Sequence, residues 1–236
     1  MAYITAGTDQ SGAKELVLKA RDPPSQAIGL LFGSILNPWA PSDWVEVSDQ
    51  VRGGSSTALL DLLQPNFPTA GVCFHGTLDT LTLGGAGFAS QSYEKKLLSF
   101  PQDRFTGLVL DVGLSPSKDT SSIRTFTIVL KNDLAGPDVD GRRQSTLSYE
   151  FDFTLPATSP TSDTEPPLDW VLSIPIPFSE LRATYRGRPK PDAKKFDPSH
   201  ITALSIMCRS FFNEQSGPFS LTIFRIGFLY SQGANE

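Results

Sequence analysis

Alternation of apolar and polar residues with a period of two is the feature that most constrains how this chain can fold. It recurs in seven runs separated by turn-rich spacers, at 72–78, 107–113, 125–131, 147–153, 170–174, 201–208 and 219–226. Such alternation is typical of β-strands with one buried face, and no strong helical periodicity lies between the runs. The pattern therefore predicts an all-β, jelly-roll β-sandwich with at most one or two short helices, one of them over residues 26–36.

Composition agrees with one folded unit. The chain has 236 residues, 39% of them hydrophobic, and its 16 Phe can fill a core, while 19 Pro and 19 Gly suit a fold with many turns. Sandwiches of this length commonly form one domain. We therefore predict a single domain over residues 1–236, with its core at about 30–230, a mobile proline-rich loop at 156–167 and a disordered tail at 231–236.

Charge and the N-terminal segment limit the partners and the compartment. A net charge of −5 argues against a protein that binds nucleic acid through phosphate contacts. The first 25 residues contain neither the Arg-rich, acid-poor composition of a transit peptide nor the apolar stretch of a signal peptide. No apolar run is long enough to span a membrane. We expect a cytoplasmic protein without membrane insertion, in which Cys73 and Cys208 are reduced core thiols.

Two stretches combine glycines with hydroxyl and amide side chains, at 44–56 and 84–91. Residues 85–90 imitate a dinucleotide-binding fingerprint, which requires a strand before it and a helix after it. A strand-like segment at 78–83 precedes the glycines, but no long amphipathic helix follows them. The stretch is therefore interpreted as a tight corner between two strands, and no cofactor is predicted.

Residues that could form a metal or nucleophile site are sparse. The two histidines, His75 and His200, lie far apart in the sequence, and no cysteine pair has ligand spacing. Residues 138–141 resemble the start of a calcium loop but are better interpreted as a hairpin turn. His75 faces the same side of its strand as Cys73 and is interpreted as a hydrogen-bonded imidazole. No metal site is predicted.

Charged residues within the strands are more informative. Glu150 and Asp152 share one face of their run, and Tyr149 lies on the other. Arg209 continues a face of the run at 201–208. Buried carboxylates and guanidiniums normally need partners, so on one concave sheet Arg209 and Glu150 could pair or could bind a polar ligand. The alternative is that these side chains form a solvated surface.

The order of motifs along the chain resembles the complex I intermediate-associated protein 30 family. The resemblance covers about residues 30–230 and rests on the segments 44–56, 75–78, 85–91, 107–113, 140–150, 174–178, 184–188, 205–209 and 217–223. It implies a galactose-binding-like β-sandwich akin to carbohydrate-binding modules. It also implies a role like that of the mitochondrial assembly chaperones of complex I. This chain differs in lacking a transit peptide, and resembles a short, fungal-type cytosolic branch of the family.

Three functions are compatible with these residues. The first is a non-catalytic interaction module, an assembly-factor-like protein that binds a protein partner through its polar face or its basic stretch at 185–199, including Arg186 and Arg188. The second is a domain that binds a sugar or another small polar molecule. Its ligand-binding candidates are Trp44, Arg52, Ser55, Ser90, Gln91, Tyr149, Glu150 and Arg209. The third is a cofactor-free cyclase or isomerase of secondary metabolism, with Glu150, Asp49 and His75 as acid–base groups.

Overall fold

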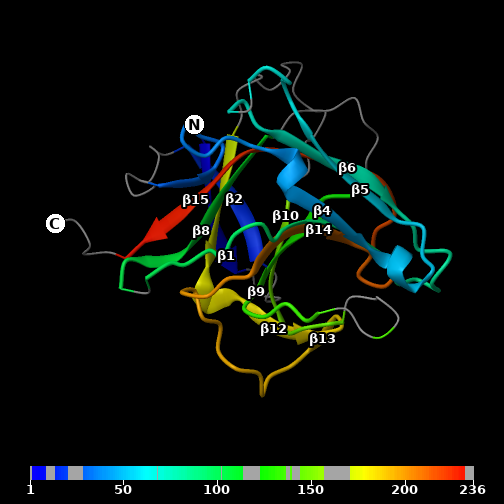
Figure 1. Cartoon of the computed structure of the whole chain (residues 1–236). Coiled ribbons are helices and arrows are strands. Elements are labelled where there is room, and N and C mark those ends of the chain that lie inside the picture. The colour runs from blue at the N-terminus through cyan, green and yellow to red at the C-terminus, as the bar shows by residue number, and fades with distance from the viewer. Residues whose placement is uncertain are drawn as a thin grey trace.

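The chain forms two stacked β-sheets in a computed structural model (Figure 1). The structure describes residues 2–8, 14–20, 29–67, 69–101, 103–113, 123–136, 139, 144–156 and 171–231, with only the backbone described for the first two segments. Every strand pair is antiparallel except the pair of β1 with β11. The described residues thus form the predicted β-sandwich; the expected mobile loop at 156–167, apart from Pro156, and the expected tail beyond Ser231 lie outside them.

One sheet has eight strands and runs in the order β2-β1-β11-β8-β15-β6-β5, with β3 paired to β15 outside this path. Its strands are β1 (Ala2–Thr8), β2 (Lys14–Ala20), β3 (Leu30–Phe32), β5 (Thr57–Leu62), β6 (Val72–Leu78), β8 (Phe105–Gly113), β11 (Val171–Pro177) and β15 (Gly217–Tyr230). The longest strand, β15, pairs with β3, β6 and β8 and so joins the two halves of this sheet.

The second sheet has seven strands in the order β13-β12-β10-β9-β14-β7-β4. Its strands are β4 (Trp44–Ser48), β7 (Phe88–Tyr93), β9 (Thr125–Lys131), β10 (Ser148–Thr154), β12 (Arg182–Tyr185), β13 (Arg188–Pro189) and β14 (Ala203–Arg209). Three short 3-10 helices, η1 (Pro41–Asp43), η2 (Asp49–Arg52) and η3 (Phe178–Glu180), complete the regular elements of the described residues.

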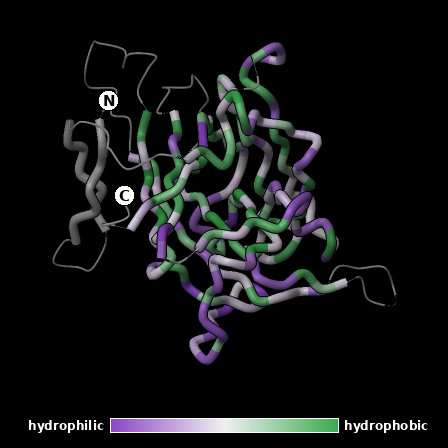
Figure 2. Tube along the Cα trace, turned by 60° about the vertical axis from the view of Figure 1, so that its left-hand side comes forward, coloured by the Kyte–Doolittle hydropathy of each residue, from purple (hydrophilic) through white to green (hydrophobic). Residues whose placement is uncertain are grey.

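The core lies between the sheets because each strand turns alternate side chains inward. Phe74, Phe126 and Phe219 pack with ring centroids 5.1–6.4 Å apart and join the two sheets at the centre. Along β9 and β14, residues of the inner face are fully buried, whereas the outer face carries polar groups. Figure 2 shows this alternation of hydrophobic and hydrophilic segments along the strands. The outer face of the seven-stranded sheet is thereby left polar.

The seven predicted runs all fall on strands of the structure, from β6 to β15. The helix expected at 26–36 is wrong where the structure describes it, because Leu30–Phe32 pairs with β15 and Gly33 turns the chain with φ +88°. The sequence interpretation also missed β1, β2, β4, β5, β7, β12 and β13. The strand-like segment at 78–83 is instead a turn after β6, and the glycine corner leads directly into β7 at Phe88.

Candidate functional site

A large open groove lies on the outer face of the seven-stranded sheet. It has a volume of about 2360 Å³ and is lined by residues of β4, β7, β9, β10, β12, β13 and β14, by η2 and η3, by the loop after β13, and by the start of β8 from the other sheet. Arg52, Ser90, Tyr149, Glu150 and Arg209 all line it. The structure therefore places five of the eight predicted ligand-binding residues along one groove, drawn from four separate segments of the sequence.

An ion-pair network forms the floor of this groove. Arg209 donates from Nη1 to Glu150 Oε2 at 2.7 Å and from Nη2 to both Asp152 oxygens at 2.6 and 2.8 Å. Arg182 also donates to Asp152. The hydroxyls of Thr184 and Thr127 donate to Glu150 and Asp152, each at 2.6 Å. We call these six residues the floor network; it holds two carboxylates against two guanidiniums and so carries no net charge.

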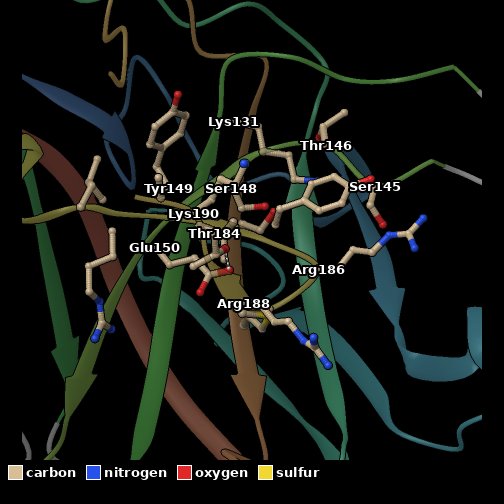
Figure 3. A pocket seen from close by; sticks show the side chains of 18 of the residues that line it. Lys131, Ser145, Thr146, Ser148, Tyr149, Glu150, Thr184, Arg186, Arg188 and Lys190 are labelled. Atoms are coloured by element: carbon tan, nitrogen blue, oxygen red, sulfur yellow. Dashed lines mark hydrogen bonds between the residues drawn. The ribbon is translucent and has the colours of Figure 1, made fainter. Parts of the chain in front are cut away.

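Burial decides what this network can do. The Glu150 side chain is only 6% exposed, and that of Arg209 is 19% exposed. A carboxylate at this depth is stabilised only while its charge partner stays in place. Figure 3 shows Glu150 next to Thr184, with Tyr149 directed the opposite way from the same strand. Three possibilities were left open for Arg209 and Glu150: a pair, a site for a polar ligand, and a solvated surface. The structure shows the pair.

Arg209 has a second environment at one end of the groove. Its guanidinium carbon lies 4.6 Å from the centroid of the Phe211 ring, a cation–π contact. Its Nε is buried and has no hydrogen-bond partner among the described residues. Phe211, Phe212 and Asn213 all have positive φ, a rare run for residues other than glycine. This turn leaves Phe212 81% exposed beside the groove.

The glycine corner at 84–87 is fastened to this end of the groove. Ser210 Oγ donates to Gly85 O at 2.8 Å and accepts from Gly87 N at 3.0 Å. A Cβ at Gly87 would lie 2.1 Å from Asp79 O, so only glycine allows this approach. The predicted corner is therefore present, and it holds β7 against the end of β14.

Hydroxyl side chains line the middle of the groove from β7 and β14. Ser205 Oγ donates to Ser92 Oγ at 2.9 Å, and Ser92 Oγ donates to Glu94 at 2.9 Å. Ser90 Oγ donates to Val47 O at 2.6 Å. The hydroxyl protons of Ser90, Ser92 and Ser205 are already donated within the protein. Only the free lone pairs of their oxygens remain to accept a hydrogen bond from a ligand.

A basic wall stands along the β12–β13 side of the groove; it consists of Arg186, Arg188, Lys194 and Lys195, all exposed. Arg186 and Gly187 form the turn between the two strands, with φ of 53° and 73°, as two-residue hairpin turns require. Figure 3 shows Arg186 and Arg188 extending from this hairpin, and the orange loop after β13 lies at the bottom of Figure 1.

Tyr149 anchors the loop that carries the two lysines. Its hydroxyl donates to Lys194 O at 2.9 Å and lies 3.4 Å from Lys195 O. Its ring packs 5.0 Å from the Phe196 centroid. Burial, and secondarily the charge of Asp133, raises the pKa of the Tyr149 phenol. Tyr149 thus lines the groove mainly as a structural support of its basic wall.

Asp49 has a structural environment and lies outside the groove lining. It is 1% exposed and accepts hydrogen bonds from Ser56 N at 3.0 Å, Ser56 Oγ at 2.6 Å and Phe88 N at 3.1 Å. A Cβ at Gly54 would lie 2.2 Å from Asp49 Oδ1. The stretch at 48–56 is therefore a loop organised around one buried carboxylate, which fixes η2 and Arg52 beside the groove.

Three other predicted ligand-binding residues also point elsewhere. Trp44 lies in the core, with its ring centroid 5.8 Å from that of Trp39 and 5.7 Å from that of Tyr93. Ser55 Oγ donates to Asp79 at 3.0 Å, and Gln91 Nε2 donates to Ala58 O at 2.7 Å. None of the three lines the groove, because Trp44 packs in the core and Ser55 and Gln91 are hydrogen-bonded to Asp79 and Ala58.

The proposed acid–base set does not assemble. His75 lies on β6 in the other sheet, where its Nε2 is 2.8 Å from Asp61 Oδ2. Glu150 lies on the outer face of the seven-stranded sheet, and Asp49 is enclosed by its own loop. The interpretation of His75 as a hydrogen-bonded imidazole agrees with this placement. The arrangement of the three residues gives no common site.

The sequence interpretation missed Arg182 and Thr184 as members of the floor network. Both lie on β12, whose four residues are too few for a clear alternation. The pattern that could have revealed them is the alternation of polar residues: Arg182 and Thr184 lie on either side of Ala183, and Arg186 and Arg188 continue the same spacing across the hairpin.

The cysteines and possible metal ligands add little to the site. Both cysteines are free thiols; Cys208 is buried, and burial raises its pKa, whereas Cys73 is only half-buried and lies 3.3 Å from Ser220 Oγ. Among the described residues, no three His, Cys, Asp or Glu side chains are grouped as metal ligands. In the same residues no helix is long and apolar enough to cross a membrane.

Comparisons with known proteins give one family. The profile described as complex I intermediate-associated protein 30 matches residues 36–223. An uncharacterized protein of Schizosaccharomyces pombe is 41% identical over 194 residues, which cover 82% of this chain and 80% of that protein. A family 11 carbohydrate-binding module of Clostridium thermocellum, solved with a mixed-linked tetrasaccharide, superposes with a TM-score of 0.48 at 16% identity, covering 79% and 88% of the two chains. A second structure of a family 11 module from the same organism gives 0.45 at 17%, covering 80% and 88%.

Proposed function

Because the chain belongs to the complex I intermediate-associated protein 30 family, we propose that it is a non-catalytic, assembly-factor-like module that binds a partner protein in its groove. The partner that the family name suggests is an intermediate of respiratory complex I. The proposed site is the groove between Arg52 on one side and the basic wall on the other.

The observation that carries this proposal is the size and openness of the groove together with its polar floor. Small-molecule sites usually occupy roughly 300–1,000 Å³ and enclose most of the ligand. A volume of about 2360 Å³ across a whole sheet face is larger and suits a segment of a macromolecule. The floor network holds this face together, since Glu150, Asp152 and Arg209 each make at least two polar contacts within it.

Affinity purification of the tagged protein, expressed at its native level, tests the proposal. Complex I subunits are expected to co-purify with the wild type and to be lost with the double variant Arg186→Glu/Arg188→Glu. A matched double reversal, Lys96→Glu/Arg124→Glu, alters two exposed basic residues outside the groove and should leave co-purification unchanged. Absence of any co-purifying protein, or equal recovery with both variants, would contradict the proposal.

A second candidate function is binding of a small polar molecule at the Arg209 end of the groove. The specific support is the buried, unpartnered Arg209 Nε, which lies beside the Phe211 ring and can still donate one hydrogen bond. Screening sugars and polar metabolites by thermal unfolding tests it. A ligand should raise the midpoint in the wild type and lose that effect with Phe211→Ala; no shift across the screen would reject this candidate.

A further inference from the structure

The charge of the groove is opposite to the charge of the chain. Nine lysines and arginines but only four aspartates and glutamates are among the described lining residues, whereas the whole chain has a net charge of −5. A lining of this kind is a local positive field in an otherwise acidic protein. Such a field concentrates anionic groups and steers their approach.

Most of this positive charge is available to a ligand. The floor network neutralises Glu150 and Asp152 with two of the arginines, and Lys190 pairs with Asp192 at 2.7 Å. By contrast, Arg52 and the four residues of the basic wall form no ion pair within the part of the chain that the structure describes. Arg52 lies 5.5 Å from the Phe88 ring centroid, and Arg186 lies 5.4 Å from that of Tyr185.

These free cations stand on opposite sides of the groove. The basic wall belongs to the β12–β13 edge of the sheet, and Arg52 lies in η2 directly after β4 at the other edge. Six strand spacings of about 4.8 Å separate β13 from β4, so the sheet spans at most about 29 Å. An extended peptide rises about 3.3 Å per residue, and about nine residues therefore reach from one edge to the other.

Exposed apolar side chains accompany the cations on both sides. Val51 and Phe212 line the groove near Arg52 and the Phe211 turn, and they are 60% and 81% exposed. Leu134 and Tyr185 line the other side and are 43% and 41% exposed. Burying such side chains stabilises a complex only when the partner has apolar surface of its own. A nucleic acid or a sulfated polysaccharide offers no aliphatic side chains to them.

We propose that the occupant of the groove is an extended, acidic segment of a protein, about nine residues long, that carries carboxylates and apolar side chains toward both of its ends. The carboxylates pair with the basic wall and with Arg52, and the apolar side chains cover Phe212, Val51 and Tyr185. This inference rests on the proposed function and specifies the chemistry of the partner segment.

Selection from a random twelve-residue peptide display library on the full immobilised chain tests the inference. The selected peptides are expected to be enriched in Asp and Glu together with Leu, Ile or Phe. A fluorescein-labelled copy of the most enriched peptide should bind at least about tenfold more weakly to Arg186→Glu/Arg188→Glu, a loss expected for two reversed charge contacts. Its affinity should also fall severalfold from about 50 to about 300 mM NaCl, because added salt screens such exposed pairs.

Two further variants test whether the peptide reaches both sides of the groove. Arg52→Glu, on the opposite side from the basic wall, should weaken the same peptide about fivefold or more. Phe212→Ser should weaken it without changing the salt dependence, since it removes apolar contact only. The control Lys96→Glu/Arg124→Glu should bind as the wild type does, and unchanged thermal midpoints show that all variants are folded.

The inference is overturned if the selected peptides carry no acidic excess, if no peptide is selected, or if both double variants bind equally. It is also overturned if labelled single-stranded RNA or heparin binds the wild type more tightly than every selected peptide. These failures differ from failure of the proposed function. If the native protein loses its partners with Arg186→Glu/Arg188→Glu while no acidic peptide binds, protein binding stands and only the acidic segment is wrong.

Discussion

Two pairs of arginines line the same groove and have opposite roles. Arg182 and Arg209 reach carboxylates in the floor network, where the Glu150 side chain is 6% exposed. Arg186 and Arg188 stand on an exposed hairpin and form no ion pair among the described residues. The difference teaches that charge alone does not mark a binding residue in this protein. Existing carboxylate partners separate arginines that hold the sheet together from arginines that remain available to a ligand; burial adds to this only at Arg209, since the Arg182 side chain is 63% exposed.

The largest expected effect is on the buried member of this comparison. Arg209→Met leaves Glu150 buried without its main charge partner and should lower the free energy of unfolding by about 4 kcal/mol. Urea denaturation measures the change. The double variant Arg209→Met/Glu150→Gln should recover much of the loss, because no unpaired charge remains. A single-variant loss below about 1 kcal/mol would mean that the floor network is not structural.

The next effect is at Asp49, a buried carboxylate that holds the position of Arg52. Asp49→Ala removes three hydrogen-bond acceptor contacts and should cost about 3 kcal/mol, again by urea denaturation. Gly54→Ala should also destabilise the protein, since its Cβ would lie 2.2 Å from Asp49 Oδ1. The two changes should be less than additive when combined, because the clash needs both side chains. Fully additive losses of stability would show that the effect of Gly54→Ala does not depend on the Asp49 side chain.

A smaller effect concerns the support of the basic wall. The pKa of the Tyr149 phenol is raised above its ordinary value of 10.0. The stability that the protonated phenol contributes is therefore complete below pH 10.0 and is lost as the pH rises through the higher pKa of the folded state. Thermal midpoints across this alkaline range should fall more steeply for the wild type than for Tyr149→Phe. Some loss should persist in the variant, since burial also raises the pKa of Tyr93. Identical slopes would exclude the role assigned to the Tyr149 hydroxyl.

The smallest stability effect is expected at the exposed member of the comparison. Arg186→Ala/Arg188→Ala should change the free energy of unfolding by no more than about 0.5 kcal/mol, because neither side chain is buried or paired to a described carboxylate. Partner binding should nevertheless fall. A loss of stability comparable to that of Arg209→Met would place these arginines with the structural pair.

The sequence predicts the sandwich well and the site only in part. Alternation predicts which residues of each long strand share a face, which is why the pairing of Glu150 with Arg209 could be anticipated as one of three outcomes. It does not say which face meets the other sheet. Trp44 was therefore predicted as a platform for a ligand, although its strand turns it into the core.

Polar residues of the glycine-rich stretches show a second limit. Ser55 and Gln91 have the chemistry of ligand-binding groups, but their partners, Asp79 and Ala58 O, are brought near only by the folding of distant segments. Arg182 and Thr184 were missed for the opposite reason, because β12 is too short to show a pattern. Whether a polar group is already satisfied depends on long-range contacts, which a local pattern does not contain.

The most direct test of the central claim compares partner recovery from two charge-reversed proteins of equal stability. When the tagged protein is expressed at its native level, complex I subunits should no longer co-purify with Arg186→Glu/Arg188→Glu. They should still co-purify with Lys96→Glu/Arg124→Glu. That result would establish the groove as the surface that binds the partner protein. Equal recovery of the same partners with both variants would contradict the claim and move the interaction to another face of the sandwich.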